Sequence, residues 1–373
     1  MFRAACAHFV DVQVISNAFL NRSSTIYKSK SLEKCNKDVL FNIGIRVLET
    51  PCVKQATLFK REFGYTCKAI GALSTLLKER CYFAIPPLLH AIKILQTSPY
   101  CITAAHWPLM QCCLLSLHLE QAIRVLKAPL FDFTSKNTGL TRVDVMRFFY
   151  YAGMVLTSLE QYDKAIEYFS QCITIPRRPV SQIAIQAYKK AVLVQILIDG
   201  TVYEAPRQSS GQIESHCDAY LALAKAVSEC DAQSFDNIVE DQASFARDGN
   251  AELAAKCRSV VSLNLVRRLA MTYSNLSIDA IVKKTGLGNA EEVMHLLGRM
   301  SNEGKISFKV DKSAQTVDFG GIDSSDYAIS QLMKTLTNVV GAYEAIVDID
   351  ERVCTSEEYA TARDAAQNKR PKV

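Results

Sequence analysis

Apolar residues change their spacing once along the chain, between residues 276 and 321, and this change limits the folds that the chain can adopt. A short helix is predicted from Ser277, and a second helix over residues 289–300 opens with the capping pattern Asn-x-x-Glu. After Gly304 the apolar residues alternate with polar ones, which predicts a hairpin of two strands. Helix, turn, helix and hairpin in this order predict a winged helix over residues 276–321.

Before this element, apolar residues recur three or four positions apart, which is the period of an amphipathic helix. In residues 149–176, the small residues Gly153 and Ala165 let two antiparallel helices approach, and Phe169 fills the space beside them. A looser copy precedes this pair in residues 107–129. Both segments are typical of tetratricopeptide-type helix pairs, so we expect a degenerate stack of them. An irregular helical bundle stays open as an alternative, because it needs the same apolar stripes.

The chain is therefore expected to be mostly α-helical, with an α-solenoid of repeats followed by a winged-helix domain and one last amphipathic helix. Further helices are predicted at residues 39–48, 58–80 (one helix or a pair), 86–95, 183–199, 219–230, 235–241 and 252–273. The predicted parts are a repeat domain at 1–178 with a weakly patterned start to about 60, a second domain at 179–322 (helical to 275, winged helix from 276 to 321), a C-terminal helix at 323–360 and a disordered tail at 361–373.

The last predicted helix has a continuous apolar stripe that begins at Ile329. A single helix with so full a stripe must bury it, either on its own chain or on the helices of other chains. The strand predicted around residues 306–310 offers a sheet edge for the same purpose. The predicted subunit-interface residues are Ile306, Phe308, Val310, Leu332, Met333, Leu336, Val339, Val340, Tyr343, Ile346 and Val347.

The composition of the chain is that of an ordinary soluble protein. The 373 residues include 43 basic and 38 acidic ones, and a net charge of +5 does not indicate a polyanion-binding protein. The 13 cysteines are odd in number and scattered among apolar helical residues, which favours reduced thiols and a reducing compartment. The first 20 residues lack the unbroken apolar core of a secretory signal. We expect the protein in the cytoplasm and nucleus.

The sequence shows no catalytic chemistry, so we expect neither an enzyme nor a bound cofactor. It contains no phosphate-binding loop with lysine, no nucleophile elbow and no kinase signature. Ligands for a metal would need close spacing on one face of an element. The nearest candidate group is Cys101, His106, Cys112, Cys113 and His118. Its members diverge around a helix, so no metal is predicted.

The charge of the winged helix argues against nucleic-acid binding. Its second helix offers Arg299 against Glu291 and Glu292, whereas phosphate neutralisation requires several basic residues on one face. The nearby basic residues occur in two small pairs, Lys283 with Lys284 and Arg267 with Arg268. Such pairs are typical of solvated helix faces. Protein contact is the better prediction, and nucleic-acid binding stays open as an alternative.

Several stretches give the chain a family resemblance. They are residues 150–154 (Tyr-Tyr-Ala-Gly-Met), 160–165, 173–176, 186–194 and 244–250. With the helical repeats and the winged helix, they resemble the PCI family, which is named for the proteasome lid, the COP-nine signalosome and a translation initiation factor. Within it, the chain is most similar to the third-subunit family of the signalosome, and a scaffold subunit of the proteasome lid is the alternative.

The resemblance implies a noncatalytic scaffold within a hetero-oligomer. In that family, hairpins of several winged helices pair edge to edge, and the C-terminal helices gather into a bundle. The partners implied are other PCI-type subunits and a metalloprotease subunit, which removes a ubiquitin-like modifier from cullins and so regulates cullin-RING ubiquitin ligases. No membrane partner is implied.

Overall fold

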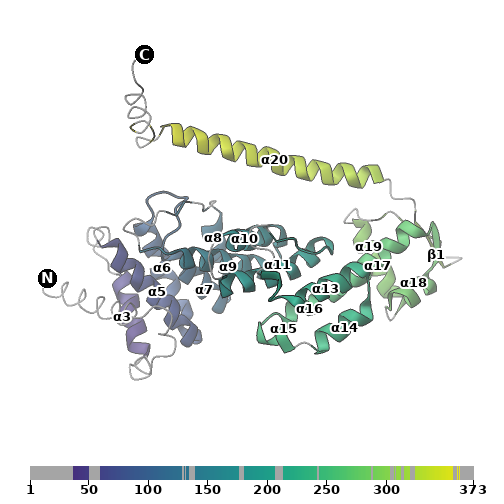
Figure 1. Ribbon diagram of the computed structural model, residues 1–373, viewed down its shortest axis with the longest axis horizontal. Coiled ribbons are helices and arrows are strands. Elements are labelled where there is room, and N and C mark those ends of the chain that lie inside the picture. Colours follow the sequence, from purple (N-terminus) through teal and green to yellow (C-terminus); the bar gives the residue numbers. More distant parts are fainter. Residues whose placement is uncertain are drawn as a thin grey trace, which may run out of the picture. The chain divides into compact units, whose positions relative to one another are not determined.

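The computed structural model is almost entirely helical and consists of two compact units, residues 1–261 and 262–373 (Figure 1). Each unit has its own apolar core. The structure describes residues 37–49, 59–127, 130, 132–133, 139–175, 180–205, 213–241, 243–286, 289–302, 306, 308–311, 315–319, 324–355, 359 and 361. The weakly patterned start to residue 36 and the predicted tail beyond residue 361 lie outside this part of the chain.

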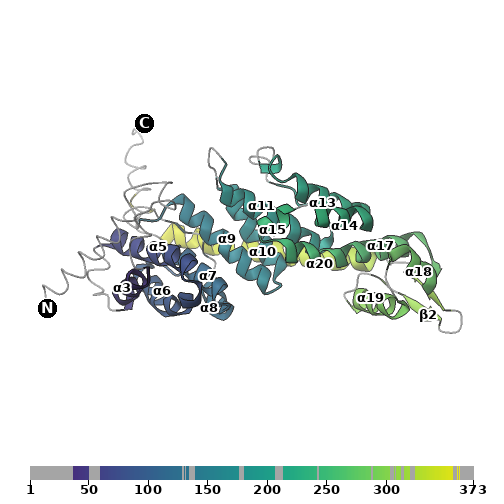
Figure 2. The same cartoon turned by 90° about the horizontal axis from the view of Figure 1, so that it is seen from below.

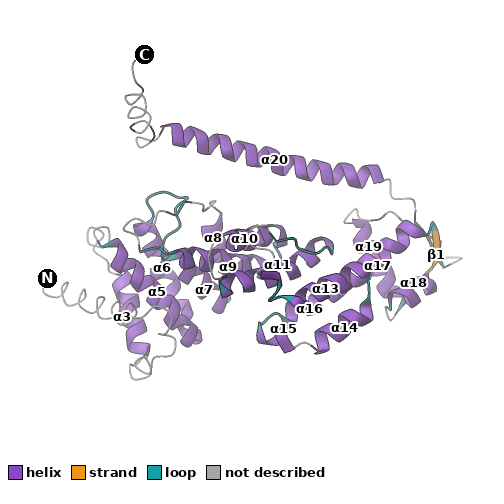
Figure 3. Ribbon diagram, in the orientation of Figure 1, coloured by secondary structure: helices purple, strands orange, loops and turns teal. Residues whose placement is uncertain are grey.

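The first unit is a succession of helices that pack in sequence order (Figure 3). They are α3 (Lys37–Glu49), α5 (Lys60–Leu76), the 3-10 helix η2 (Lys78–Arg80), α6 (Cys81–Leu95), α7 (His106–Leu115), α8 (Leu119–Leu126), α9 (Arg142–Ser158), α10 (Tyr162–Thr174), α11 (Gln182–Asp199), α13 (Asp218–Glu229), α14 (Ala232–Asp241), α15 (Ala243–Arg247) and α16 (Ala251–Lys256). Helix α10 packs against both α9 and α11, and the three are seen side by side in Figure 2. The expected mostly helical fold is confirmed.

The close approach of α9 and α10 depends on a glycine, as the sequence predicts. A Cβ added at Gly153 would lie 2.6 Å from Cε1 of Phe169, so only glycine fits here without movement. Ala165 and Phe169 are fully buried in the same contact. The predicted roles of these small and large residues are therefore confirmed.

One turn geometry recurs between successive helices of this unit. A residue in the left-handed region ends the first helix, and the next N–H donates to a carbonyl five residues back, which is the Schellman arrangement. The left-handed residues are Leu117, Glu160, Cys230 and Gly249, and the long bonds are His118 to Cys113, Gln161 to Leu156, Asp231 to Ala226 and Asn250 to Phe245. The first two turns are 43 positions apart (160 − 117), and the later intervals differ from this one. The repeat is thus degenerate, as expected.

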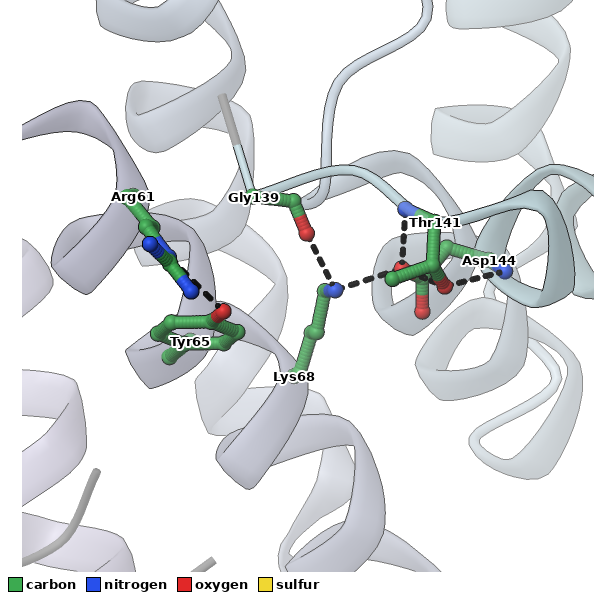
Figure 4. A network of polar contacts seen from close by, with 6 residues as sticks. All are labelled: Arg61, Tyr65, Lys68, Gly139, Thr141 and Asp144. Atoms are coloured by element: carbon green, nitrogen blue, oxygen red, sulfur yellow. Dashed lines mark hydrogen bonds and ion pairs between the residues drawn. The ribbon is translucent and has the colours of Figure 1, made fainter. Parts of the chain in front are cut away.

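A buried ion pair links α5 to the start of α9 (Figure 4). Nζ of Lys68 lies 2.5 Å from Oδ2 of Asp144 and donates to the carbonyl of Gly139 at 2.6 Å. Asp144 also accepts from the backbone N–H of Thr141, and the Thr141 hydroxyl accepts from the N–H of Asp144, so the two form a capping box. One carboxylate therefore caps α9 and holds it against α5. No periodicity predicts this contact.

Some predicted helix boundaries were wrong. Helix α6 begins at Cys81 rather than at residue 86, and it contains Pro86 and Pro87. Both prolines lie in the second turn of the helix, so each removes one intrahelical hydrogen bond. The segment predicted as a helix at 252–273 is two helices, α16 and α17 (Arg258–Thr272), separated at Cys257, and α15 was not predicted. Such short elements carry too few residues to show a period.

The second unit contains the winged helix. Its elements are residues 262–272 of α17, which begins in the first unit, and then β1 (Asn275–Ser277), α18 (Ile278–Thr285), α19 (Ala290–Asn302), β2 (Lys309–Asp311), β3 (Thr316–Asp318) and α20 (Ser324–Thr355). The sheet is antiparallel with the order β1-β3-β2, and Val317 lies between Leu276 and Val310. The predicted hairpin is present, although β2 begins at Lys309 rather than near residue 306, and it is accompanied by a third strand, β1, which was not predicted.

No helix among the described residues is long and apolar enough to cross a membrane. The predicted domain boundary at residue 178 stays a prediction. Buried residues on both sides of it, including Phe169 and Tyr188, belong to one apolar cluster.

Candidate subunit interface

The core of the winged helix fixes the position of its sheet. Ile281, Leu297 and Val317 are fully buried in it, so both helices and the central strand contribute. Oγ of Ser277 accepts from the N–H of Ala280 at 3.3 Å and thereby caps α18 where β1 ends. The cap therefore fixes the end of β1 to the start of α18.

Strand β2 lies at one edge of this sheet, because the central strand is β3. Of the predicted interface residues near it, Ile306 is buried in the core, Phe308 is partly buried against it, and Val310 is half-buried opposite Val317. Their side chains therefore point largely to their own domain. An edge strand can still bind a neighbour through its backbone.

Helix α20 is long and continuous (Figure 1), and its apolar stripe is exposed. Every predicted interface residue on it is exposed, and even the least exposed, Val347, has 38% of its surface accessible. Ile349 and Val353 extend the exposed apolar surface beyond the predicted set. A soluble protein rarely presents so many apolar side chains in a row unless another surface covers them.

The stripe on α20 repeats every seven residues. One row contains Ile329, Leu336 and Tyr343, the next contains Leu332, Val339, Ile346 and Val353, and a third contains Met333, Val340 and Val347. A strict seven-residue spacing keeps an apolar seam facing a partner helix in a left-handed supercoil. Three adjacent rows make a stripe wider than a two-helix seam needs. The pattern is therefore typical of a helix that packs in a bundle of several helices.

Two of the stretches that carry the family resemblance meet in a buried polar network. Asp248 accepts from Nζ of Lys189 at 2.7 Å, from Nε2 of Gln186 at 3.0 Å and from the hydroxyl of Tyr220 at 2.9 Å. Burial would raise the pKa of Asp248, but the hydrogen bonds from Lys189, Gln186 and Tyr220 outweigh it, and its pKa is lowered. The network ties α11 and α13 to the turn between α15 and α16.

The neighbouring lysine has a different environment. Nζ of Lys190 donates to Oδ1 of Asn250 at 2.6 Å, and Nδ2 of Asn250 donates to the hydroxyl of Tyr220 at 2.9 Å. Burial lowers the pKa of Lys190 to about 8, against a weaker opposing effect of Asp248. Of the two adjacent lysines, Lys189 therefore binds the carboxylate of Asp248 and Lys190 binds the amide of Asn250. The sequence does not predict these different partners.

The residues considered for a metal site do not come together as ligands. Nδ1 of His106 accepts from the N–H of Thr103 at 2.9 Å, Cys112 donates to the hydroxyl of Ser74, and the ring of His118 contacts the ring of Tyr82 at a tilt of 42°. Burial raises the pKa of the Cys112 thiol to about 12, so it is no ready source of thiolate. In the described part of the chain, no three histidine, cysteine or acidic residues form a group that could hold a metal ion.

Comparison with known proteins supplies the family. The model of the N-terminal helical repeats of COP9 signalosome complex subunit 3 matches residues 17–213, which is more than half of the chain. The chain belongs to the COP9 signalosome subunit 3 family. The PCI domain model matches residues 234–320, so this member of the family has helical repeats followed by a PCI domain.

Two relatives illustrate the extent of the similarity. The chain is 27% identical over 266 residues to COP9 signalosome complex subunit 3 of Dictyostelium discoideum, and 26% identical over 263 residues to the protein of the same name from Arabidopsis thaliana. Each match covers 69% of this chain. It covers 63% and 59% of the respective relatives, which is less than two thirds of their length.

Proposed function

We propose that this protein is a noncatalytic scaffold subunit of the COP9 signalosome. The complex would remove a ubiquitin-like modifier from cullins, and so regulate cullin-RING ubiquitin ligases, through a metalloprotease that another subunit supplies. The partners proposed are other PCI-type subunits and that metalloprotease, in the cytoplasm and nucleus. The family membership supports this proposal.

The exposed heptad stripe of α20 carries the proposal. Burying an apolar side chain such as Leu336 stabilises an assembly by about 1.5–3 kcal/mol, and the stripe repeats this gain along more than three heptads. Edge strand β2 offers a second, backbone-mediated contact. Both features serve the binding of neighbouring subunits and neither contributes a reactive group.

The test is to capture the tagged full chain from gentle lysate and to weigh the intact assembly by native mass spectrometry. We expect a set of PCI-type chains with one metalloprotease, and the identities of these partners distinguish the signalosome from the proteasome lid. With Leu336→Asp the chain should be lost from the assembly, because a charge would have to be buried in the seam. The protein should keep its helical circular dichroism.

Asn338→Asp is the matched control, since it adds the same charge to an exposed position outside the apolar rows of α20. This variant should assemble as the wild type does. Retention of the Leu336→Asp chain in the complex would contradict the proposed interface. A chain that copurifies with nucleic acid alone would contradict the scaffold function and favour nucleic-acid binding. Lys284, one of the basic residues considered for such binding, donates to the hydroxyl of Tyr273 at 3.0 Å.

A further inference from the structure

Helix α7 carries polar side-chain atoms that are buried without a hydrogen-bond partner among the described residues. Two of them are Nε1 of Trp107 and Oε1 of Gln111, on residues that are 3% and 4% exposed. These residues are four positions apart and therefore lie one turn apart on the same face of α7. The third atom, Nε2 of His106, belongs to a ring that packs against Phe148. Because buried polar groups are nearly always paired, an unpaired donor beside an unpaired acceptor indicates a ligand.

A cation beside these atoms also lacks a polar partner. Cζ of Arg147, on α9, lies 4.8 Å from the centroid of the Trp107 ring. Among the described residues, the guanidinium of Arg147 makes no hydrogen bond and no ion pair, and its side chain is half-buried. A guanidinium stacked on an aromatic face keeps its N–H donors in its own plane, where they can bind an anion. Arg147 therefore places an uncompensated positive charge next to the indole N–H.

Tyr151 positions the amide of Gln111 in this group. The Tyr151 hydroxyl accepts from Nε2 of Gln111 at 3.1 Å, which leaves Oε1 of the same amide as the unpaired acceptor. Tyr151 lies four positions after Arg147, so both residues occupy one face of α9. Trp107, Gln111, Arg147 and Tyr151 are called the α7–α9 polar cluster below. The cluster offers a guanidinium and an indole N–H as donors, and an amide oxygen as acceptor.

We propose that the α7–α9 polar cluster binds a carboxylate of a partner polypeptide. A carboxylate has about four acceptor sites, so it can bind the guanidinium of Arg147 at two points and also accept from the indole N–H of Trp107. A peptide N–H beside that carboxylate donates to Oε1 of Gln111. Within the described residues only stacking holds Arg147, so its side chain can move off the ring and admit the carboxylate to the buried N–H. The proposal does not depend on the interface proposed on α20.

The test is a fluorescence titration of the full chain. The chain contains a single tryptophan, so tryptophan emission reports on this site alone. The probes are acetyl-Gly-Glu-Gly-amide, with a side-chain carboxylate, acetyl-Gly-Gly-Gly, with a C-terminal carboxylate, and acetyl-Gly-Gln-Gly-amide, with neither. We expect a saturable change in emission with a carboxylate peptide, and the tighter of the two identifies the source of the carboxylate. The glutamine peptide should give no such change, because it has no charge to pair with Arg147.

A pair of arginine variants completes the test. Arg147→Met keeps an apolar stem over the ring but removes the guanidinium, so it should weaken binding of the carboxylate peptide by about tenfold or more. Arg142→Met is the matched control, since it removes an exposed arginine from the first turn of α9, and should bind as the wild type does. No saturable change with either carboxylate peptide, an equal change with the glutamine peptide, or unchanged binding by Arg147→Met would overturn the proposal. Tighter binding of inorganic phosphate than of both carboxylate peptides would also overturn it.

Discussion

Single residues set the distances between helices in the first unit. Gly153 allows α9 to lie against the ring of Phe169, and Gly71 lies in a similar way against Trp107, whose ring a Cβ would approach to 2.8 Å. The sequence could predict the role of Gly153 because Ala165 and Phe169 follow at repeat spacing. It could not predict the role of Gly71, because its contact comes from a helix outside that repeat.

Gly153→Ala should lower the free energy of unfolding by about 1–3 kcal/mol, because the added methyl group would overlap Phe169. Urea denaturation followed by circular dichroism measures this loss. Gly298→Ala is the matched control, since a Cβ there meets nothing within 4 Å in helix α19. It should be neutral or stabilise by up to about 1 kcal/mol. Equal effects of the two variants would contradict the assigned contact.

His106 makes the stability of the first unit depend on pH. Burial lowers the pKa of its imidazole to about 4, so the folded protein keeps it neutral and accepting from Thr103. The unfolded chain takes up the proton near pH 6.5. The stability is therefore full above pH 6.5 and is lost as the pH falls from 6.5 toward 4, by on the order of 3 kcal/mol.

The variant His106→Asn isolates this effect. Its amide oxygen can still accept from Thr103, but it has no proton to gain. Unfolding free energies measured at several pH values should fall less steeply below pH 6.5 in the variant than in the wild type. Identical slopes would mean that other groups cause the acid sensitivity.

At the level of helices and strands, the periodicity of apolar residues and the spacing of small residues predicted most of the elements. The geometry of the turns between them was not predicted. Helix α11 lies within one residue of its predicted bounds at each end, because it is long and Gly200 marks its end. Strand β1 was not predicted, since its three residues Asn275–Ser277 directly precede a helix and have no alternating neighbours. The left-handed residues at Leu117, Glu160 and Cys230 were also missed, since glycine usually marks such positions.

Leu117→Gly should stabilise the first unit by about 1 kcal/mol, because glycine adopts the left-handed conformation without strain. The urea midpoint should rise accordingly. Leu117→Ala removes the same exposed side chain but keeps the Cβ, so it should leave the midpoint nearly unchanged. A rise of equal size in both variants would indicate that exposure of leucine, and not its backbone conformation, is the cause.

At the level of the whole molecule, the sequence predicted a helical array, a winged helix and a C-terminal amphipathic helix in this order. The predicted interface residues on α20 are exposed, but which subunits cover them stays a prediction. Patterning alone could not locate the network around Asp248, because its members come from α11, α13 and a distant turn. Tertiary contacts of this kind leave no period in the sequence.

When one of the two apolar cores is destabilised, we expect only the unit that contains it to unfold more often. Leu297→Ala removes a fully buried side chain of the winged-helix core and should cost about 2–5 kcal/mol. Hydrogen exchange should accelerate in residues 266–319 and change little in α9 to α11. Leu193→Ala, in the first core, should show the reverse pattern. Uniform acceleration by either variant would show that the units unfold together.

The burial of Lys190 makes its chemical labelling a measure of local opening in the folded protein. In the native state the side chain is buried against Asn250, out of reach of acylating reagents. A molecule acylated at this position must therefore have opened around α11 before it reacted. The extent of labelling at Lys190, relative to exposed lysines such as Lys225, would report how often that region opens.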